Sequence, residues 1–282
     1  MNIEQALKEG AHILYTACVT DTPFLEASLL LCSVLDLQKE ELYRHDSIEL
    51  ENAQHERYLQ LVQKRAAYHP IAYLIGKQEF WGLPFIVNEN VLIPRNDTET
   101  LVEQALSMLD EETEYRVLDL ATGSGCVGIA VATERPLAHV LLSDLSAKAL
   151  TIALANSKEL LGKELPTIQS DLFRSLQNLR FHMIMSNPPY LSSQWIDQCE
   201  KQVKKEPIMA LDGMGDDGLS LIRHIISESP HYLENGGILL LECDYRQHQE
   251  ISDLLLARGF SQIGGKRDLQ GLLRVVWGVW HV

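Results

Sequence analysis

Arg116-Val-Leu-Asp-Leu-Ala-Thr-Gly-Ser-Gly125 is a short apolar strand that runs into a glycine-rich turn. The next residues, 126–133, are mostly apolar and predict a helix. Glycines in such a turn let a ligand approach the backbone, and the start of the helix offers free N–H groups. This order of strand, glycine turn and helix predicts a ligand site at the carboxyl end of a strand.

The alternation of strands and helices continues from this stretch to the end of the chain. Asn235-Gly236-Gly237 predicts a tight turn before the fifth strand. Because strands alternate with helices, we expect an α/β fold with a mostly parallel sheet and helices on both faces. The predicted strands are 116–120, 139–143, 167–169, 183–186, 238–242, 261–264 and 273–280, and the predicted helices are 126–133, 147–161, 219–232 and 247–256.

The first part of the chain has a different pattern. Apolar residues at helical spacing, such as Ile3, Leu7 and Leu14, predict helices through residues 1–75. Residues 78–87 are rich in β-forming residues, and Asn88-Glu89-Asn90 predicts the turn of a hairpin whose second arm is 91–94. We therefore expect a helical N-terminal domain (1–75), a β-hairpin linker (76–95) and a second domain (96–282). Whether the helical domain only packs or recognises a substrate stays open at this level.

Composition narrows the class of protein and of partner. The 282 residues carry a net charge of −15, which disfavours a polyanionic partner because nucleic-acid affinity rests on Lys and Arg. The five cysteines are far apart and show neither metal-ligand spacing nor a disulfide framework, so we expect reduced thiols and no metal. The N-terminus lacks the pattern of a signal peptide, and no apolar run reaches the ~18 residues of a membrane span. These features predict a cytoplasmic protein without membrane contact.

The glycine turn and a following acid predict an adenosine-containing cofactor. Gly123 and Gly125 form G-x-G, and Gly128 extends the pattern to G-x-G-x-x-G by what we interpret as a coincidence of the helix. Asp144 ends the next strand, about 20 residues on, where an acid can bind ribose hydroxyls. This geometry is shared by NAD and S-adenosylmethionine. Asp119, just before the turn, could meet the amino group of S-adenosylmethionine, which favours that cofactor.

The motif Ser186-Asn187-Pro188-Pro189-Tyr190 ends the fourth predicted strand of the sheet. The two prolines stop the strand and stiffen the turn. The Asn187 carbonyl and freed proline carbonyls can accept hydrogen bonds from an –NH₂ group, and the Tyr190 ring offers a flat face to a planar group. A plain strand-ending turn is the alternative interpretation of this motif alone.

With these motifs, nearly the whole chain resembles the release factor glutamine methyltransferases, the HemK/PrmC family of protein-(glutamine-N5) methyltransferases. The most specific matches are in the linker region and in the segment that follows it. The matching segments are Pro70-Ile-Ala-Tyr-Leu-Ile-Gly76, Glu79-Phe-Trp-Gly-Leu83, Leu92-Ile-Pro-Arg-Asn-Asp-Thr-Glu99, 119–125, 187–190, Glu206-Pro207, Ala210-Leu211 and 215–219.

The resemblance implies a class I S-adenosylmethionine-dependent methyltransferase domain, Rossmann-like, with a mostly parallel seven-stranded sheet. Its implied substrate is the glutamine of the Gly-Gly-Gln motif in peptide chain release factors, and its implied product is S-adenosylhomocysteine. The motif of Asn187, Pro188, Pro189 and Tyr190 would bind the glutamine, with Asn187, Pro188 and Tyr190 as catalytic residues. The implied cofactor contacts are Ala121, Thr122, Gly123, Ser124, Gly125, Asp144, Leu172 and Asn187.

Two positions depart from the family pattern. Ala121 stands where glycine is usual, and alanine is tolerated there if its backbone φ is negative. Asn96 stands where proline is common, and we expect little effect from it. Compared with a protein that has glycine at this position, we therefore expect cofactor binding to be unchanged or weaker. We do not expect it to be lost.

Other functions stay open beside the one that the resemblance implies. An NAD-dependent oxidoreductase would have no use for the Asn-Pro-Pro-Tyr motif. An amino-methyltransferase acting on nucleic acid would share this motif but would need a basic face. A further alternative is methylation of another protein glutamine, and a non-catalytic adaptor would not need the cofactor loop. We expect release factors as partners, no direct nucleic-acid contact, and a monomer.

Overall fold

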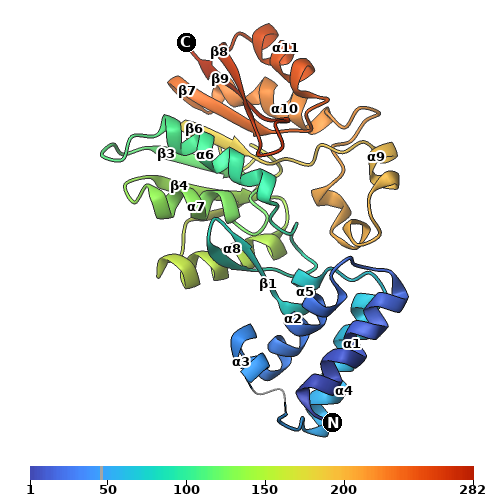
Figure 1. Cartoon of the computed structure of the whole chain (residues 1–282). Coiled ribbons are helices and arrows are strands. Elements are labelled where there is room, and N and C mark those ends of the chain that lie inside the picture. The colour runs from blue at the N-terminus through green and yellow to red at the C-terminus, as the bar shows by residue number, and fades with distance from the viewer. Residues whose placement is uncertain (45–46) are drawn as a thin grey trace. The chain divides into compact units, whose positions relative to one another are not determined.

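The computed structural model of this chain describes residues 1–44 and 47–282. Contacts within the chain separate it into two compact units (Figure 1). The first unit contains Met1–Lys77 and Glu200–Lys205, and the second contains Gln78–Cys199 and Glu206–Val282.

The first unit is built from helices around its own apolar core. Leu14, Leu30 and Tyr58 lie fully buried in this core. Arg65 is buried beside them, and its Nε and Nη2 atoms donate to the two carboxylate oxygens of Glu26 at 2.6 and 3.1 Å. The elements of this unit are α1 (Ile3–Ala17), α2 (Pro23–Leu35), α3 (Lys39–Arg44), α4 (Asn52–Ala66), α5 (Ile71–Ile75) and the short 3-10 helix η2 (Val203–Lys205). Within residues 1–44 and 47–282, none of the helices combines the length and apolar character needed to cross a membrane.

The hairpin begins at the junction of the two units, but its turn is not where the sequence predicts it. Strands β1 (Lys77–Phe80) and β2 (Leu83–Ile86) pair with each other across Trp81 and Gly82. Both turn residues have positive φ, 54° and 66°, as the tight type I′ hairpin turn requires. A turn is present at 88–90, where Val91 N donates to Asn88 O at 3.2 Å, but it does not join two strands, because residues 91–94 form no strand. The predicted hairpin with 91–94 as its second arm is therefore wrong. The turn at 81–82 was not predicted because its first residue, Trp81, has a positive φ without being glycine.

The second unit contains a seven-stranded sheet of order β5-β4-β3-β6-β7-β9-β8. The first five strands of this order are parallel, and β9 pairs antiparallel with both β7 and β8. This confirms the predicted Rossmann-like fold. The strands are β3 (Arg116–Leu120), β4 (His139–Asp144), β5 (Thr167–Gln169), β6 (Phe181–Ser186), β7 (Leu233–Glu242), β8 (Ser261–Arg267) and β9 (Leu273–Trp280).

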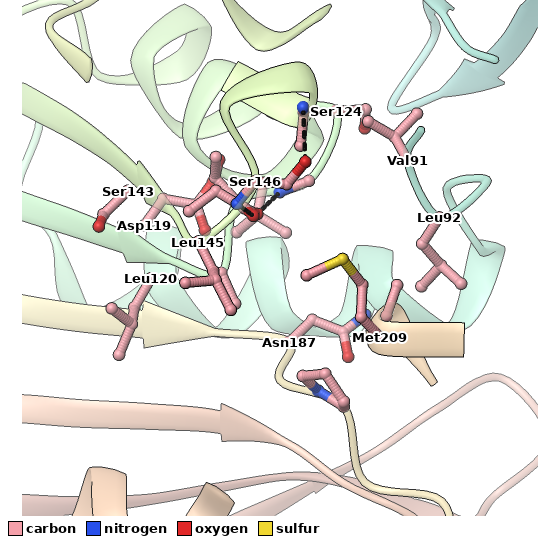
Figure 2. A pocket seen from close by; sticks show the side chains of 18 of the residues that line it. Val91, Leu92, Asp119, Leu120, Ser124, Ser143, Leu145, Ser146, Asn187 and Met209 are labelled. Carbon is pink, nitrogen blue, oxygen red and sulfur yellow. Dashed lines mark hydrogen bonds between the residues drawn. The ribbon is translucent and has the colours of Figure 1, made fainter. Parts of the chain in front are cut away.

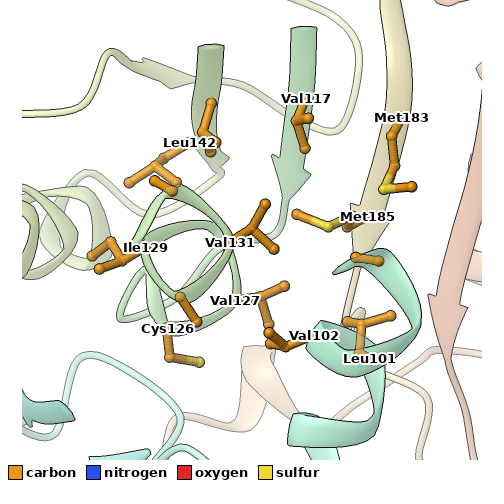
Figure 3. Packing of buried hydrophobic residues seen from close by; sticks show 14 of the residues in the cluster. Leu101, Val102, Val117, Cys126, Val127, Ile129, Val131, Leu142, Met183 and Met185 are labelled. Carbon is orange, nitrogen blue, oxygen red and sulfur yellow. The ribbon is translucent and has the colours of Figure 1, made fainter. Parts of the chain in front are cut away.

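Helices cover both faces of this sheet because strand residues point alternately to opposite faces. Val117, Met183 and Met185 pack with α6 (Glu99–Met108) and α7 (Cys126–Glu134), as Figure 3 shows. Leu118 and Ile184 point to the other face, toward the cluster formed with α10 and α11. The remaining helices are α8 (Ala147–Leu161), α9 (Ser193–Gln198), α10 (Ser220–Glu228) and α11 (His248–Arg258), with 3-10 helices η1 (Asn96–Thr98), η3 (Ile208–Ala210) and η4 (Ser229–His231).

Two local predictions in this unit are wrong. Strand β7 begins at Leu233 and not at Ile238. Asn235-Gly236-Gly237 forms an irregularity inside it, with a φ of 80° at Gly236, where the pairing with β6 shifts register between Phe181 and Met183. Gly128 is not a coincidence of the helix: a Cβ there would lie 2.5 Å from Leu142 Cδ2 and 2.9 Å from Asp119 Oδ2. Glycine is needed at this position because α7 approaches the sheet too closely for a side chain.

Candidate functional site

The sheet places the two sequence motifs side by side. The strand order reverses between β3 and β6, which is the point where open α/β sheets bind ligands. Leu120, at the end of β3, is the register partner of Ser186, at the end of β6. The Ser186 hydroxyl donates to the Leu120 carbonyl at 2.6 Å. The glycine loop and the Asn-Pro-Pro-Tyr motif therefore leave the sheet from adjacent strands.

A cavity opens at these strand ends, and Figure 2 shows Asp119, Ser146, Asn187 and Met209 around it. The second unit supplies its whole lining. Most of the predicted cofactor residues contribute to it. The predicted residues that line the cavity are Ala121, Thr122, Gly123, Ser124, Asp144, Leu172, Asn187 and Pro189.

Three predicted residues, Gly125, Pro188 and Tyr190, are not among those that line this cavity. At Gly125 φ is 84°, and an added Cβ would lie 2.8 Å from Ile129 Cδ1, so this glycine allows the turn and the close packing of α7. The roles in catalysis and binding that the resemblance assigns to these residues stay predictions.

The glycine loop has a left-handed backbone at three positions, and one of them is not glycine. Ala121 has a φ of 58°, Gly123 one of 56° and Gly125 one of 84°. The negative φ on which the expected tolerance of alanine depended is therefore not found at Ala121. An alanine in the left-handed region is strained because its Cβ crowds the following carbonyl oxygen. The loop keeps its conformation through a hydrogen bond from Thr122 N to Ser143 O, at 3.0 Å.

Asp119 is a buried acid at the floor of the cavity. Its Oδ2 atom accepts hydrogen bonds from the Thr122 hydroxyl at 2.5 Å and from Gly128 N at 2.9 Å. Burial raises the pKa of the Asp119 carboxyl to about 7, although both hydrogen bonds lower it. A cation bound in the cavity would favour the ionised form of Asp119.

Asp144 connects the glycine loop with the start of α8. Its Oδ2 accepts from Gly123 N and its Oδ1 from Ser146 N, each at 2.8 Å. Burial raises the pKa of Asp144, and these backbone hydrogen bonds oppose the rise. Each carboxylate oxygen has a second lone pair, so Asp144 can also accept from ligand hydroxyls.

The Asn-Pro-Pro-Tyr motif is held by residues from other elements. Asn187 Nδ2 donates to Thr98 Oγ1 at 3.2 Å. The Tyr190 hydroxyl donates to Glu242 Oε1 at 3.1 Å, so the tip of this ring is directed to the end of β7. Gln247 Nε2 donates to the Tyr190 carbonyl at 2.8 Å. Burial, and secondly the neighbouring Glu242, raise the pKa of Tyr190.

Sequence reasoning missed several residues of this region. Thr98 lines the cavity, whereas Glu242 is buried behind the motif. A visible signal for Glu242 was an acid at the end of the apolar run 238–241. Glu206, part of a segment that carries the resemblance, is buried and accepts hydrogen bonds from Ile93 N at 3.0 Å and from Arg95 Nη2. It thereby joins the two segments that carry the lining residues Leu92 and Pro207.

The charged residues Arg95, Asp97 and Glu99, near the start of the second unit, make different contacts. Arg95 lines the cavity. Asp97 instead pairs with Arg274 at 3.1 Å, and Glu99 Oε1 accepts from Trp81 N at 2.8 Å.

In the part of the chain that the structure describes, no group of three or more His, Cys, Asp or Glu could hold a metal ion.

Two family descriptions match the chain. Residues 5–76 match the PrmC N-terminal domain, and residues 97–210 match the methyltransferase small domain. Curated relatives extend the match to nearly the full length. A release factor glutamine methyltransferase of Coxiella burnetii is 40% identical and covers 98% of each chain. That of Escherichia coli is 36% identical over 93% of this chain and 94% of its own.

Solved structures share the fold at much lower sequence identity. A methyltransferase from Pyrococcus furiosus has a TM-score of 0.53 at 14% identity, covering 82% of this chain and all of its own. The Thermus thermophilus 16S rRNA N2 G1207 methyltransferase, solved with AdoMet and guanosine, has a TM-score of 0.53 at 17% identity. It covers 72% of this chain and 49% of its own. These likenesses concern the fold alone.

Proposed function

Because this chain belongs to the family of release factor glutamine methyltransferases, we propose that it methylates a glutamine of peptide chain release factors. The acceptor is the side-chain amide nitrogen (N5) of the glutamine in the Gly-Gly-Gln motif, and the donor is S-adenosylmethionine. The observation that carries the proposal is the shared cavity: Asn187 and the glycine loop line the same space at the reversal of the strand order.

The chemistry of the lining fits S-adenosylmethionine. Its ammonium and sulfonium groups are cationic, and the cavity is lined by three acids, Asp119, Asp144 and Asp171. Ser143 also lines the cavity, and its Oγ is buried without a hydrogen-bond partner among the residues described. Residues 121–124 and Leu172 would enclose the cofactor, and Asp144 would accept hydrogen bonds from its ribose. When bound, this cofactor supplies an electrophilic methyl group.

The chain's own contribution to the reaction is the positioning of a weak nucleophile. The lone pair of an amide nitrogen is delocalised into its carbonyl, so alignment with the methyl group must provide much of the rate. Asn187 Oδ1 and the Pro188 carbonyl would accept the two N–H groups of the glutamine, and the Tyr190 ring would pack on the amide plane. These acceptors become more effective as positive charge develops on the nitrogen. The proton leaves to solvent after transfer, so a strong general base is not required.

The partner and compartment follow from this substrate. Release factors act during translation, so we place the enzyme in the cytoplasm, in agreement with the five free cysteines of the described residues. The net charge of −15 favours a protein acceptor over nucleic acid. We expect one chain to be sufficient because the second unit alone supplies the cavity lining.

One assay separates this function from its alternatives. The protein is incubated with tritiated S-adenosylmethionine and a release factor, its Gly-Gly-Gln to Gly-Gly-Ala variant, DNA or RNA. We expect label only in the unaltered release factor. Label in nucleic acid would overturn the proposal in favour of a nucleic-acid amino-methyltransferase, and label in the Gly-Gly-Ala variant would move the acceptor to another residue.

A further inference from the structure

A short series of polar side chains runs from the candidate site into the protein behind it. Asn187 contacts Thr98, while Thr98 and Tyr190 both lie beside the carboxylate of Glu242. We propose that Glu242 and Thr98 are positioning residues, which set the orientation of the Asn187 amide so that its oxygen faces the substrate. The effect on catalysis rests on the proposed function. The orientation of the Asn187 amide rests on the hydrogen bonds alone.

The orientation of the Asn187 amide follows from the direction of each hydrogen bond. Asn187 Nδ2 donates to Thr98 Oγ1 at 3.2 Å, so the Thr98 oxygen acts as the acceptor in this contact. A hydroxyl has a single hydrogen, and that of Thr98 is then free to point elsewhere. An ionised carboxylate only accepts hydrogen bonds, which makes Glu242 the natural acceptor for it. The hydrogens of Thr98 and Tyr190 would therefore both point to Glu242.

Glu242 has the surroundings that this role needs. It is only 1% exposed, and its Oε2 atom has no partner of hydrogen-bonding geometry in the described residues, while Oε1 accepts from Tyr190. The Thr98 side chain interacts with this carboxylate, and a hydroxyl hydrogen directed to it reduces the cost of burying an unpaired oxygen. Burial raises the pKa of Glu242 to about 7. Hydrogen bonding from Thr98, the charge of Arg274 and the Tyr190 hydroxyl oppose this rise, and Asp97 adds to it.

The consequence for Asn187 is a choice between two orientations. With Nδ2 on Thr98, the Oδ1 atom is turned away from Thr98 and can accept an N–H of the substrate amide. With the amide flipped, Oδ1 would meet an oxygen whose hydrogen is already given to Glu242, and Nδ2 would present a donor to the –NH₂ group of the substrate. The flipped form cannot bind the glutamine nitrogen through Asn187. Glu242 thus acts on the substrate through Thr98, although it does not line the cavity.

The test replaces the Thr98 hydroxyl by a methyl group of similar size. Thr98→Val removes the acceptor and the hydrogen, whereas Thr98→Ser keeps both. Thr100→Val is the matched control, because Thr100 is also buried, is on the first turn of α6, and is not a cavity-lining residue. For each full-length variant we would measure kcat and KM with release factor, the Kd for S-adenosylmethionine, and the ¹⁵N–¹H signals of the Asn187 side-chain amide.

We expect Thr98→Val to lower kcat by about tenfold or more, which corresponds to about 1.4 kcal/mol of lost transition-state stabilisation. Its Kd for S-adenosylmethionine should stay within about threefold, and the Asn187 amide signals should shift and exchange faster with solvent. Thr98→Ser and Thr100→Val should resemble the wild type in all three measurements. If Thr98 orients Asn187 through its hydroxyl, Thr98→Ser should restore the wild-type Asn187 amide signals. A purely structural role of Thr98 does not predict this restoration.

Two results would overturn the inference: unchanged Asn187 signals in Thr98→Val, or a kcat within twofold of the wild type. Loss of activity in Thr98→Ser together with unchanged amide signals would also count against it. If the wild type methylates no release factor, the proposed function fails, and the amide signals alone then decide whether Thr98 orients Asn187.

Discussion

Ala121 shows how a single residue can conflict with the backbone that it must adopt. Its φ of 58° lies in the left-handed region, which costs an L-residue other than glycine about 1–2 kcal/mol. The fold tolerates this cost because neighbouring hydrogen bonds hold the loop. Part of it is offset because alanine loses less conformational entropy on folding than glycine, by about 0.4–1 kcal/mol.

The first prediction concerns this strain. Ala121→Gly should raise the free energy of unfolding of the second unit by roughly 0.5–1 kcal/mol, the difference of the two effects. The affinity for S-adenosylmethionine should be equal or higher. Thermal unfolding with and without the cofactor measures both. Ala155→Gly, inside α8, is the control and should destabilise by about 1 kcal/mol. If Ala121→Gly and Ala155→Gly lowered the free energy of unfolding by similar amounts, Ala121 would not be strained.

The second prediction at the scale of residues concerns the side chain of Asn187. Asn187→Ala should reduce kcat to background and leave the Kd for S-adenosylmethionine within about threefold, because Asn187 is the proposed acceptor for the substrate amide. Turnover kinetics and calorimetry provide the two values. Asn52→Ala, on the exposed start of α4, should behave as the wild type. Substantial activity without the Asn187 side chain would remove it from the mechanism.

At the scale of elements, the end of β7 supports the motif at the end of β6. Glu242 accepts from the Tyr190 hydroxyl, and Gln247, just before α11, donates to the Tyr190 carbonyl. The motif is therefore held by an adjacent strand and by the loop that follows it. A substitution at Glu242 should change catalysis without any contact to the ligand.

The third prediction is the pH dependence that Glu242 gives to the reaction. Burial raises its pKa to about 7, and only the ionised form is purely an acceptor for Thr98 and Tyr190. With saturating S-adenosylmethionine, kcat should therefore fall as the pH decreases through about 7. Glu242→Gln should have a lower kcat that is nearly flat between about pH 6 and 8. Initial rates in overlapping buffers measure both profiles.

The control for this profile is Glu234→Gln, at the other end of β7, where Glu234 pairs with Arg116. It should keep the wild-type profile.

The pH dependence of stability provides an independent test of the Glu242 titration. The pKa of Glu242 is raised in the folded state, so the folded state binds the proton more tightly than the unfolded state. Its contribution to stability is present below the unfolded pKa of about 4.5 and is lost as the pH rises to about 7. Glu242→Gln should lose this part of the pH dependence. An unchanged rate profile in Glu242→Gln would assign the titration to another group.

At the scale of the whole molecule, periodicity was sufficient to predict the order of strands and helices and the parallel sheet. The strand-end positions of Asp144 and Asn187 then followed from the rule for ligand sites in such sheets. Local chemistry was predicted less well. Positive φ at Trp81 and Ala121 leaves no pattern in side-chain type, and the need for glycine at 128 appears only when α7 meets the sheet. Thr98 and Glu242 are distant in sequence from the motif and become its neighbours only through folding.

The division of the chain into two units leads to the last prediction, which concerns substrate recognition. The first unit has its own core, with Leu14 and Tyr58, and supplies none of the cavity lining. We propose that it recognises the body of the release factor, while the second unit performs the transfer. A chain of residues 77–282 lacks the first unit except for Lys77 and Glu200–Lys205. It should then bind S-adenosylmethionine within about threefold of the full chain, but its kcat/KM for release factor should fall by about tenfold or more.

A short peptide that contains Gly-Gly-Gln separates recognition from catalysis in this experiment. Because the peptide lacks the body of the release factor, the full chain and residues 77–282 should methylate it at similar rates. The variant Arg65→Met tests the same point in the full-length protein, since it leaves the partly buried Glu26 without its bidentate partner and disturbs the first unit alone. It should lose activity toward release factor and keep activity toward the peptide. Equal losses on both substrates would instead show that the helices of the first unit are needed to hold the catalytic unit in its active form.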